Sequence, residues 1–133
     1  MKIVDTNVIL RYLLNDVDEL VVKAAVILEN DHIFIPVEII AEVVYVLEKV
    51  YKTERDEIAN SIKGLGRYKN IEMNEREIVY RAMDYYESKR LDFIDCLLLA
   101  YHTVKDIEIE TFDRKLKTHI ENSRMGREEA EDR

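Results

Sequence analysis

Three short apolar runs, each followed by a longer segment with helical spacing, constrain the fold of this chain more than any other feature. The runs are Lys2–Asp5, Ile33–Ile35 and Ile71–Met73. Runs of this length fit buried strands, whereas the segments between them are long enough for helices. Parallel strands need such a helical crossover between them. The sequence therefore predicts an α/β fold that is rich in helix: a three-layer α/β/α sandwich around a central, mostly parallel sheet.

The predicted helices follow from apolar residues that recur every three or four positions. They cover Thr6–Leu14, Asp18–Glu29, Val37–Tyr51, Glu54–Leu65, Glu75–Arg90, the segment from Asp92 to Val104 and the segment from Asp113 to Ile120. Ile107–Thr111 alternates apolar and acidic residues, which favours an edge or half-exposed strand. Residues 121–133 are charged with almost nothing to bury, so we expect a disordered tail after a single domain at 1–120.

The composition excludes several classes of protein. The single cysteine, Cys96, cannot form an internal disulfide and fits the reducing cytoplasm. One cysteine and three scattered histidines also cannot assemble a Cys/His zinc site. No apolar run approaches the ~18 residues that span a bilayer, so we expect no membrane association. The N-terminus enters a strand without a basic region, so we expect no signal peptide.

The net charge of −8 argues against a protein that grips nucleic acid with a broad basic surface. It does not exclude an enzyme that reaches phosphate through bound divalent cations, because a metal reverses the local charge. The placement of the acidic residues therefore matters more than their number.

Four carboxylates occupy positions that suggest a shared site. Asp5 ends the first predicted strand, and Asp113 follows the last one. Ligands of open parallel sheets bind outside the carboxyl ends of the strands, where both aspartates would lie. Asp95 and Glu42 belong to predicted helices that can pack beside this edge.

Each of these aspartates also has a structural interpretation. Asp5 and Asp113 can be the N-caps of the helices that follow them. Asp92 and Asp95 are three residues apart, as in a capping box, and acids at those positions favour the helix dipole. For any one of them alone, the structural role explains the residue as well as a functional role does.

Glu42 belongs to a helix that is otherwise mostly apolar. The polar residues of this helix follow helical spacing and can form one narrow solvated face. They are Glu38, Glu42, Tyr45 and Lys49. The same stripe on a mostly buried helix can instead line a cleft, and periodicity alone does not decide between the two.

Together, the four acids suit a hard divalent cation. Magnesium binds oxygen ligands, usually a few carboxylates, and keeps some of its water. Carboxylates that are forced together repel one another, which a protein tolerates when a cation neutralises them. Such a site can activate water and stabilise charge on a phosphate during its transfer. We therefore take the convergence of the four acids on a metal as a hypothesis.

At these residues the sequence resembles a PIN domain, most closely the VapC-type toxins of prokaryotic toxin–antitoxin pairs. The resemblance covers about residues 1–120 and rests on four stretches in a fixed order. They are IVDTNVILRYLL, IPVEIIAEVVYVL, LDFIDCLLLAYH and IETFDRKL. Cys96 stands where the family usually has a small residue such as alanine, a departure that affects no catalytic role.

The resemblance implies an endoribonuclease that depends on Mg²⁺ or Mn²⁺ and cuts RNA with metal-activated water. The family's catalytic and metal-binding acids fall on Asp5, Glu42, Asp95 and Asp113, of which Asp5 and Asp95 are the firmest metal ligands. Supporting positions fall on Asn7, Thr111 and Asp92, and Asp92 can equally be only a helix cap. The resemblance also implies a cytoplasmic homodimer that a cognate antitoxin protein holds inactive.

Basic side chains near the acids bear on RNA binding. Arg11, Arg114 and Lys115 can flank the cleft, although ordinary solvated charge explains each of them alone. A phosphatase of the haloacid dehalogenase type is a rival, but it needs a second carboxylate where this chain has Asn7. A response-regulator receiver is a second rival, but it needs paired acids after the first strand, and this sequence does not clearly offer them. A catalytically inactive PIN-like binding module is the remaining alternative, and metal binding distinguishes it from the nuclease.

Overall fold

The computed structural model describes residues 1–15 and 18–131, with the backbone alone for 127–131. The chain divides into two compact units, Met1–Arg76 and Glu77–Arg133. All the strands of the described residues belong to the first unit, and the regular elements described in the second unit are helices.

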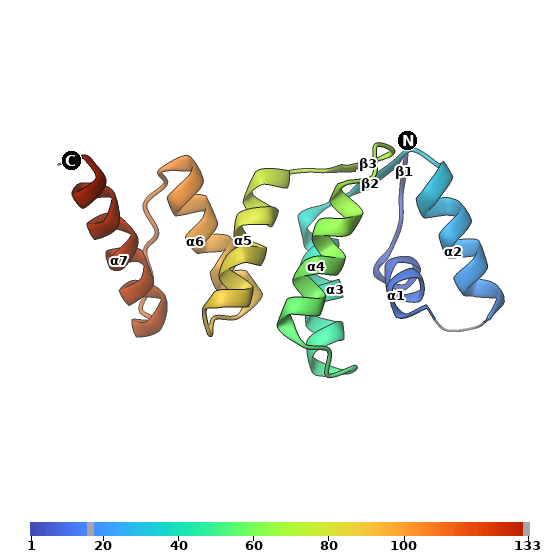
Figure 1. The fold of residues 1–133 in the computed structure, drawn as a ribbon, viewed down its shortest axis with the longest axis horizontal. Coiled ribbons are helices and arrows are strands. Elements are labelled where there is room, and N and C mark those ends of the chain that lie inside the picture. Colours follow the sequence, from blue (N-terminus) through green and yellow to red (C-terminus); the bar gives the residue numbers. More distant parts are fainter. Residues whose placement is uncertain (16–17, 132–133) are drawn as a thin grey trace. The chain divides into compact units, whose positions relative to one another are not determined.

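The first unit is an α/β structure with a parallel sheet. Its elements are β1 (Lys2–Ile3), α1 (Thr6–Leu14), α2 (Glu19–Asn30), β2 (Ile33–Ile35), α3 (Val37–Lys49), α4 (Arg55–Gly66) and β3 (Ile71–Met73), labelled in Figure 1. The strand order is β1-β2-β3, and both pairs are parallel. Ile33 pairs with Lys2 on one side and with Ile71 on the other. The predicted helix-rich α/β class with a central parallel sheet is thereby confirmed.

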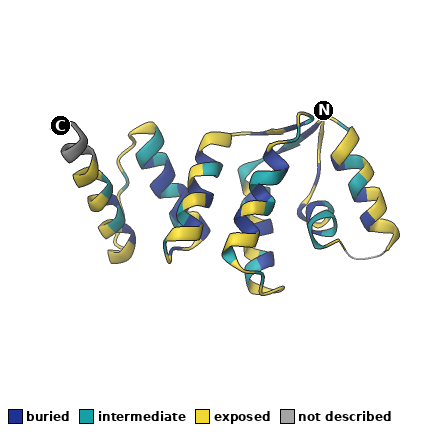
Figure 2. Ribbon diagram, in the orientation of Figure 1, coloured by how far each residue is buried: buried dark blue, intermediate teal, exposed yellow. Residues whose placement is uncertain are grey.

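The core of the first unit lies where the helices meet the central strand. Ile33 and Ile35 of β2 are fully buried, as expected for a strand with a neighbour on each side. Each helix buries one face and exposes the other, which Figure 2 shows as alternating dark blue and yellow along the ribbons. The fully buried side chains from the helices include Ile9, Leu28, Ile40, Ile58 and Ile62. Burial of each contributes about 1.5–3 kcal/mol, which makes these residues the main source of stability.

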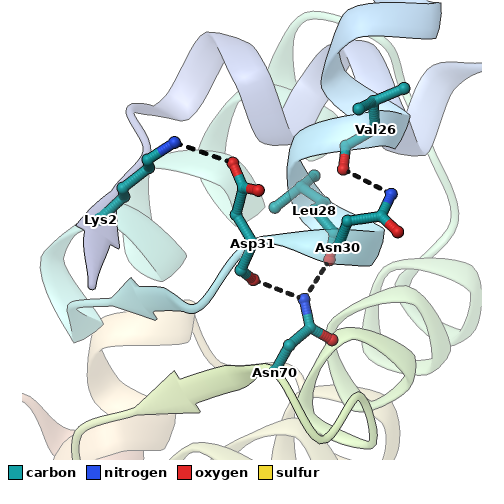
Figure 3. Close-up of polar contacts among 6 residues, drawn as sticks. All are labelled: Lys2, Val26, Leu28, Asn30, Asp31 and Asn70. Carbon is teal, nitrogen blue, oxygen red and sulfur yellow. Dashed lines mark hydrogen bonds and ion pairs between the residues drawn. The ribbon is translucent and has the colours of Figure 1, made fainter.

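A single asparagine ties the end of α2 to the third strand (Figure 3). The Asn70 amide Nδ2 donates to the carbonyl of Leu28 at 2.7 Å and to that of Asp31 at 2.8 Å. Lys2 Nζ lies 3.0 Å from Asp31 Oδ2. Carbonyls at a helix end have no partner within the helix, so Asn70 satisfies groups that burial would otherwise leave unpaired. The ion pair of Lys2 joins β1 to the end of α2; this strand ends at Ile3, two residues before Asp5 and earlier than predicted.

The second unit contains α5 (Arg76–Ser88, apart from its first residue), α6 (Phe93–Lys105) and α7 (Arg114–Glu131). Tyr86 and Phe93 pack edge to face with their ring centroids 6.2 Å apart, and both are buried. The hydroxyls of Tyr85 and Thr103 are hydrogen-bonded at 2.8 Å. Aromatic packing and this polar contact therefore hold α5 against the α6 segment.

The predicted strand at Ile107–Thr111 is wrong, because residues 106–113 adopt no regular structure. A strand needs a ladder partner, and the described part of the second unit offers none. The segment is fixed instead by a side chain, since the buried His102 Nδ1 lies 2.9 Å from the carbonyl oxygen of Ile107. Ile107 itself is exposed.

The last helix is longer than predicted, since α7 continues from Ile120 to Glu131. Arginine, glutamate, methionine and alanine are strong helix formers, and extending an existing helix costs far less than starting one. Residues 132 and 133 of the predicted tail lie outside the described residues. The division into a domain at 1–120 and a disordered tail at 121–133 stays a prediction. None of the described helices combines the length and the apolar character needed to cross a bilayer.

Candidate functional site

Asp5 is the N-cap of α1 and is exposed to solvent. Its Oδ1 accepts a hydrogen bond from the backbone N–H of Val8 at 3.2 Å. The structural interpretation of Asp5 as a cap is therefore confirmed. The cap uses one carboxylate oxygen, and the second oxygen accepts no hydrogen bond from another described residue. The capping bond holds the carboxylate in one orientation without occupying it completely.

Two hollows of the first unit meet at Asp5. The β1 hollow has a volume of about 470 Å³ and also contains Lys2 and Ile39. The α1–α2 hollow has a volume of about 270 Å³ and also contains Asn7, Arg11 and Lys23. Asp5 therefore lies beside space that a ligand can enter from two sides, with basic side chains in both.

The basic side chain of Arg11 is held in place by the helix that faces it. Arg11 Nη1 donates to Asp18 Oδ2 at 2.7 Å. The other oxygen of the same carboxylate, Oδ1, accepts from the backbone N–H of Val21 at 3.0 Å and so caps α2. One carboxylate thus starts a helix and positions a guanidinium, which makes the placement of Arg11 a consequence of the cap.

Glu42 lies on the exposed side of α3, whose opposite side is buried. The buried residues are Ile40, Val43, Val44 and Leu47, and the exposed ones include Glu38, Glu42, Tyr45 and Lys49. The predicted polar stripe is therefore an exposed face of the helix. That Glu42 lines a cleft stays a prediction.

In the second unit, Asp92 and Asp95 stand at the start of α6. Asp92 occupies the N-cap position, but its side chain makes no hydrogen bond to the helix. The interpretation of this pair as a capping box is therefore wrong. Asp95 is half-buried in the first turn, next to the fully buried Cys96. Capping does not explain these two acids, in contrast to Asp5.

Asp113 is the acid that begins α7. Its Oδ1 accepts from the backbone N–H of Leu116 at 2.8 Å, as in an N-cap. The Thr111 hydroxyl oxygen accepts from the backbone N–H of Asp113 at 3.0 Å. The Thr111 hydroxyl therefore fixes the backbone that carries the Asp113 carboxylate, and its supporting role in a metal site stays a prediction.

Asp92, Asp95 and Asp113 of the second unit are close enough for the first and last to act on Asp95. Burial, followed by the charges of Asp113 and Asp92, raises the pKa of the Asp95 carboxyl above its ordinary value. Asp95 has no hydrogen bond or ion pair to another described residue. A half-buried carboxylate with acidic neighbours and no compensating cation is costly, so the sequence maintains it at some expense of stability.

The structure thus brings together Asp92, Asp95 and Asp113 in one unit, and Asp5 with Asn7 in the other. Within either unit, no three acidic, histidine or cysteine side chains of the described residues form a ready-made metal site. The donors nevertheless fit a divalent cation, because they are carboxylates without cationic partners among the described residues. Burial and the like charges of Asp113 and Asp92 both raise the pKa of Asp95. The assembly of all four predicted acids into one site stays a prediction.

Two residues near Asp5 were missed by sequence reasoning: Asp18, which positions Arg11, and Lys23, which lines the α1–α2 hollow. A signal for Lys23 exists in the sequence. Leu20, Lys23 and Ile27 lie three, four and seven positions apart, which places them on one side of α2. The role of Asp18 depends on a contact with another helix, so periodicity could not reveal it.

Comparison with known proteins identifies the family of the chain. The model of the PIN domain family matches residues 2–120, so the chain belongs to the PIN domain family. A curated relative is the VapC ribonuclease of Aquifex aeolicus (strain VF5), which is 27% identical over 122 residues. The match covers 88% of this chain and 90% of that protein. No solved structure shows a significant match to the chain.

Proposed function

We propose that this protein is an endoribonuclease that depends on a divalent metal and is the toxin of a VapC-type toxin–antitoxin pair. The observation that carries the proposal is the half-buried Asp95 carboxylate, whose pKa is raised by burial and further by the charges of Asp113 and Asp92. Membership of the PIN domain family and the similarity to a VapC ribonuclease support it. A protein that served only as a scaffold would have no use for a half-buried carboxylate beside two like charges.

The residues that would hold the metal are Asp5 and Asp95 first, with Glu42 and Asp113 completing the site directly or through water. Magnesium or manganese, when bound, lowers the pKa of coordinated water and stabilises charge on the phosphate. The N-cap bonds of Asp5 and Asp113 orient one oxygen of each carboxylate and leave the other for a ligand. Thr111 would support Asp113 by fixing its backbone, Asn7 lies beside Asp5 in the α1–α2 hollow, and Asp92 adds negative charge near Asp95.

The acidic net charge is compatible with an RNA substrate. Cations neutralise the acidic side chains locally, and the basic residues that line the hollows at Asp5 attract the RNA backbone. We further propose that the toxin is a cytoplasmic homodimer that its antitoxin keeps inactive. The similarity to VapC-type proteins is the support for these assembly partners.

The test of this function is cleavage of mixed cellular RNA by the purified protein with Mg²⁺ or Mn²⁺. The wild type is expected to cut RNA, and EDTA is expected to stop the reaction. Asp5→Asn and Asp95→Asn should be inactive yet folded, since asparagine retains the capping oxygen at position 5. Thermal melting of each variant checks that the loss is not a loss of fold.

Matched variants on α3 add a control. Glu42→Gln is expected to lose most of the activity, whereas Glu38→Gln, one helical turn earlier on the same exposed face, should keep it. An inert wild type that equals all the variants would contradict the proposal and favour a PIN-like binding module. Release of phosphate from small esters without RNA cleavage would favour a magnesium-dependent phosphatase instead.

A further inference from the structure

The α1–α2 hollow has the character of a second phosphate site beside Asp5. We propose that Asn7, Arg11 and Lys23 hold a phosphate of the RNA backbone that neighbours the phosphate to be cut. This inference rests on the proposed function and adds positioning residues to it. Lys23 is its most testable member.

The geometry places these side chains in one space. The hollow has a volume of about 270 Å³ and is lined from α1 by Asp5, Asn7 and Arg11 and from α2 by Lys23. Asp5 also belongs to the β1 hollow, so the two spaces meet at a proposed metal ligand. A chain that presents one phosphate near Asp5 therefore has room for its neighbour between α1 and α2.

Arg11 is suited to bind a phosphate because Asp18 fixes its guanidinium and leaves other N–H donors available. Its contact with Asp18 Oδ2 at 2.7 Å involves one guanidinium nitrogen. A guanidinium has five N–H donors in a rigid fork, so several remain for an anion. The Asp18 side chain is itself fixed by the cap of α2. The guanidinium is therefore positioned before a ligand arrives, which reduces the entropy that binding costs.

Lys23 supplies a positive charge that forms no ion pair with a carboxylate of the described residues. It is exposed on α2, and no ion pair or hydrogen bond joins it to another described residue. Lys2 of the β1 hollow differs, because its ammonium nitrogen lies 3.0 Å from Asp31 Oδ2. An ammonium group that lacks an internal partner attracts an external anion most strongly.

The apolar part of the hollow fits the rest of a nucleotide. Leu20 and Val8 line the same space, and Leu20 is 49% exposed. Apolar walls lower the local dielectric constant and so strengthen the attraction between a phosphate and the two cations. They also offer a surface for a ribose or a base.

The experiment compares Lys23→Gln, Lys23→Arg and a control, Lys69→Gln, which removes an exposed lysine of the same unit outside both hollows. Binding of a fluorescent single-stranded RNA is measured by anisotropy in EDTA at several salt concentrations. Lys23→Gln is expected to raise Kd about three- to tenfold and to lower the salt slope by ~0.7, the value for one phosphate contact on a single strand. Lys23→Arg should stay within about twofold of the wild type, because it keeps the charge.

Cleavage kinetics with Mn²⁺ distinguish a role of Lys23 in positioning RNA from a general effect of removing a surface charge. Lys23→Gln should raise KM in parallel with Kd, while Lys69→Gln changes neither by more than about twofold. Equal weakening by Lys23→Gln and Lys69→Gln, an unchanged Kd for Lys23→Gln, or a wild type that does not bind the RNA would overturn the inference. A wild type that binds RNA through Lys23 without cutting it would contradict the nuclease and leave the phosphate site standing. RNA cleavage with the same Kd and KM in Lys23→Gln as in the wild type would support the nuclease and contradict the phosphate site.

Discussion

Asp5 and Asp113 perform the same local task in opposite electrical surroundings. Each accepts a backbone N–H at the start of a helix, from Val8 at 3.2 Å and from Leu116 at 2.8 Å. Asp5 shares its hollows with basic side chains, among them Lys23. Asp113 instead lies near Asp95, a second acid whose pKa is raised first by burial and then by the charge of Asp113.

The difference shows that capping and function are not competing explanations of an aspartate. A cap fixes where a carboxylate points, whereas the neighbouring charges decide what it can attract. The basic side chains in the hollow at Asp5 favour an anion such as phosphate beside that carboxylate, and the acids around Asp95 favour a cation. A nuclease that uses a metal to cut a phosphodiester needs both kinds of environment.

The largest expected effect is on the rate of RNA cleavage, which should fall much further in Asp95→Asn than in Asp92→Asn. Asp95→Asn should lower kcat/KM for RNA cleavage at least ~100-fold, because it removes a proposed metal ligand. Asp92→Asn should lower it less than about tenfold if Asp92 contributes only charge. Initial rates on a labelled RNA with Mn²⁺ measure both. Equal losses in the two variants would make Asp92 a ligand as well.

Removal of the two caps should have a smaller effect, on stability. Asp5→Ala is expected to lower the free energy of unfolding by about 1 kcal/mol, because the N–H of Val8 loses its partner. Asp113→Ala should cost less, since the lost cap is offset by relief of repulsion on Asp95. Urea denaturation without metal measures both, and Asp5→Asn, which keeps a capping oxygen, is the control. A larger loss of unfolding free energy in Asp113→Ala than in Asp5→Ala would contradict the difference in surroundings between the two caps.

The smallest effect concerns the pH dependence of stability. The pKa of Asp95 in the folded protein lies above its ordinary value of 3.8, so folding favours the protonated form. Stability from this group is therefore fully present below that value and is lost as pH rises through the folded-state pKa. In EDTA, Asp95→Asn should melt higher than the wild type at pH 7, and the difference should shrink toward pH 4. A lower melting temperature for Asp95→Asn than for the wild type at pH 7 would contradict the claim that the charged Asp95 destabilises the fold.

Local sequence patterns predicted the elements whose formation depends on nearby residues. Ile33–Ile35 and Ile71–Met73 are strands with the predicted limits, and Thr6–Leu14 is a helix between the predicted residues. The buried side of α3 also follows from apolar spacing. In each case, the periodicity that marks the element also marks the face that it buries.

Local sequence patterns did not predict contacts between residues that are distant in the sequence. Ile107–Thr111 has the alternation of a strand, but the pattern contains no information about whether a partner strand is present. Spacing made Asp92 and Asp95 resemble a capping box, yet the hydrogen bond depends on a side-chain orientation that spacing does not determine. The pairing of Arg11 with Asp18 likewise depends on how α1 and α2 pack. The resemblance to PIN domains supplied the grouping of acids that the patterns alone left open.

Titration of Mn²⁺ into the protein without RNA tests most directly whether the crowded acids form a cation site. Melting curves and calorimetry are recorded for the wild type, Asp95→Asn and Glu38→Gln. The account predicts that Mn²⁺ binds the wild type and Glu38→Gln, raises their melting temperatures, and does neither for Asp95→Asn. The same Mn²⁺ response in Asp95→Asn as in the wild type, or no response in any of the three, would contradict it.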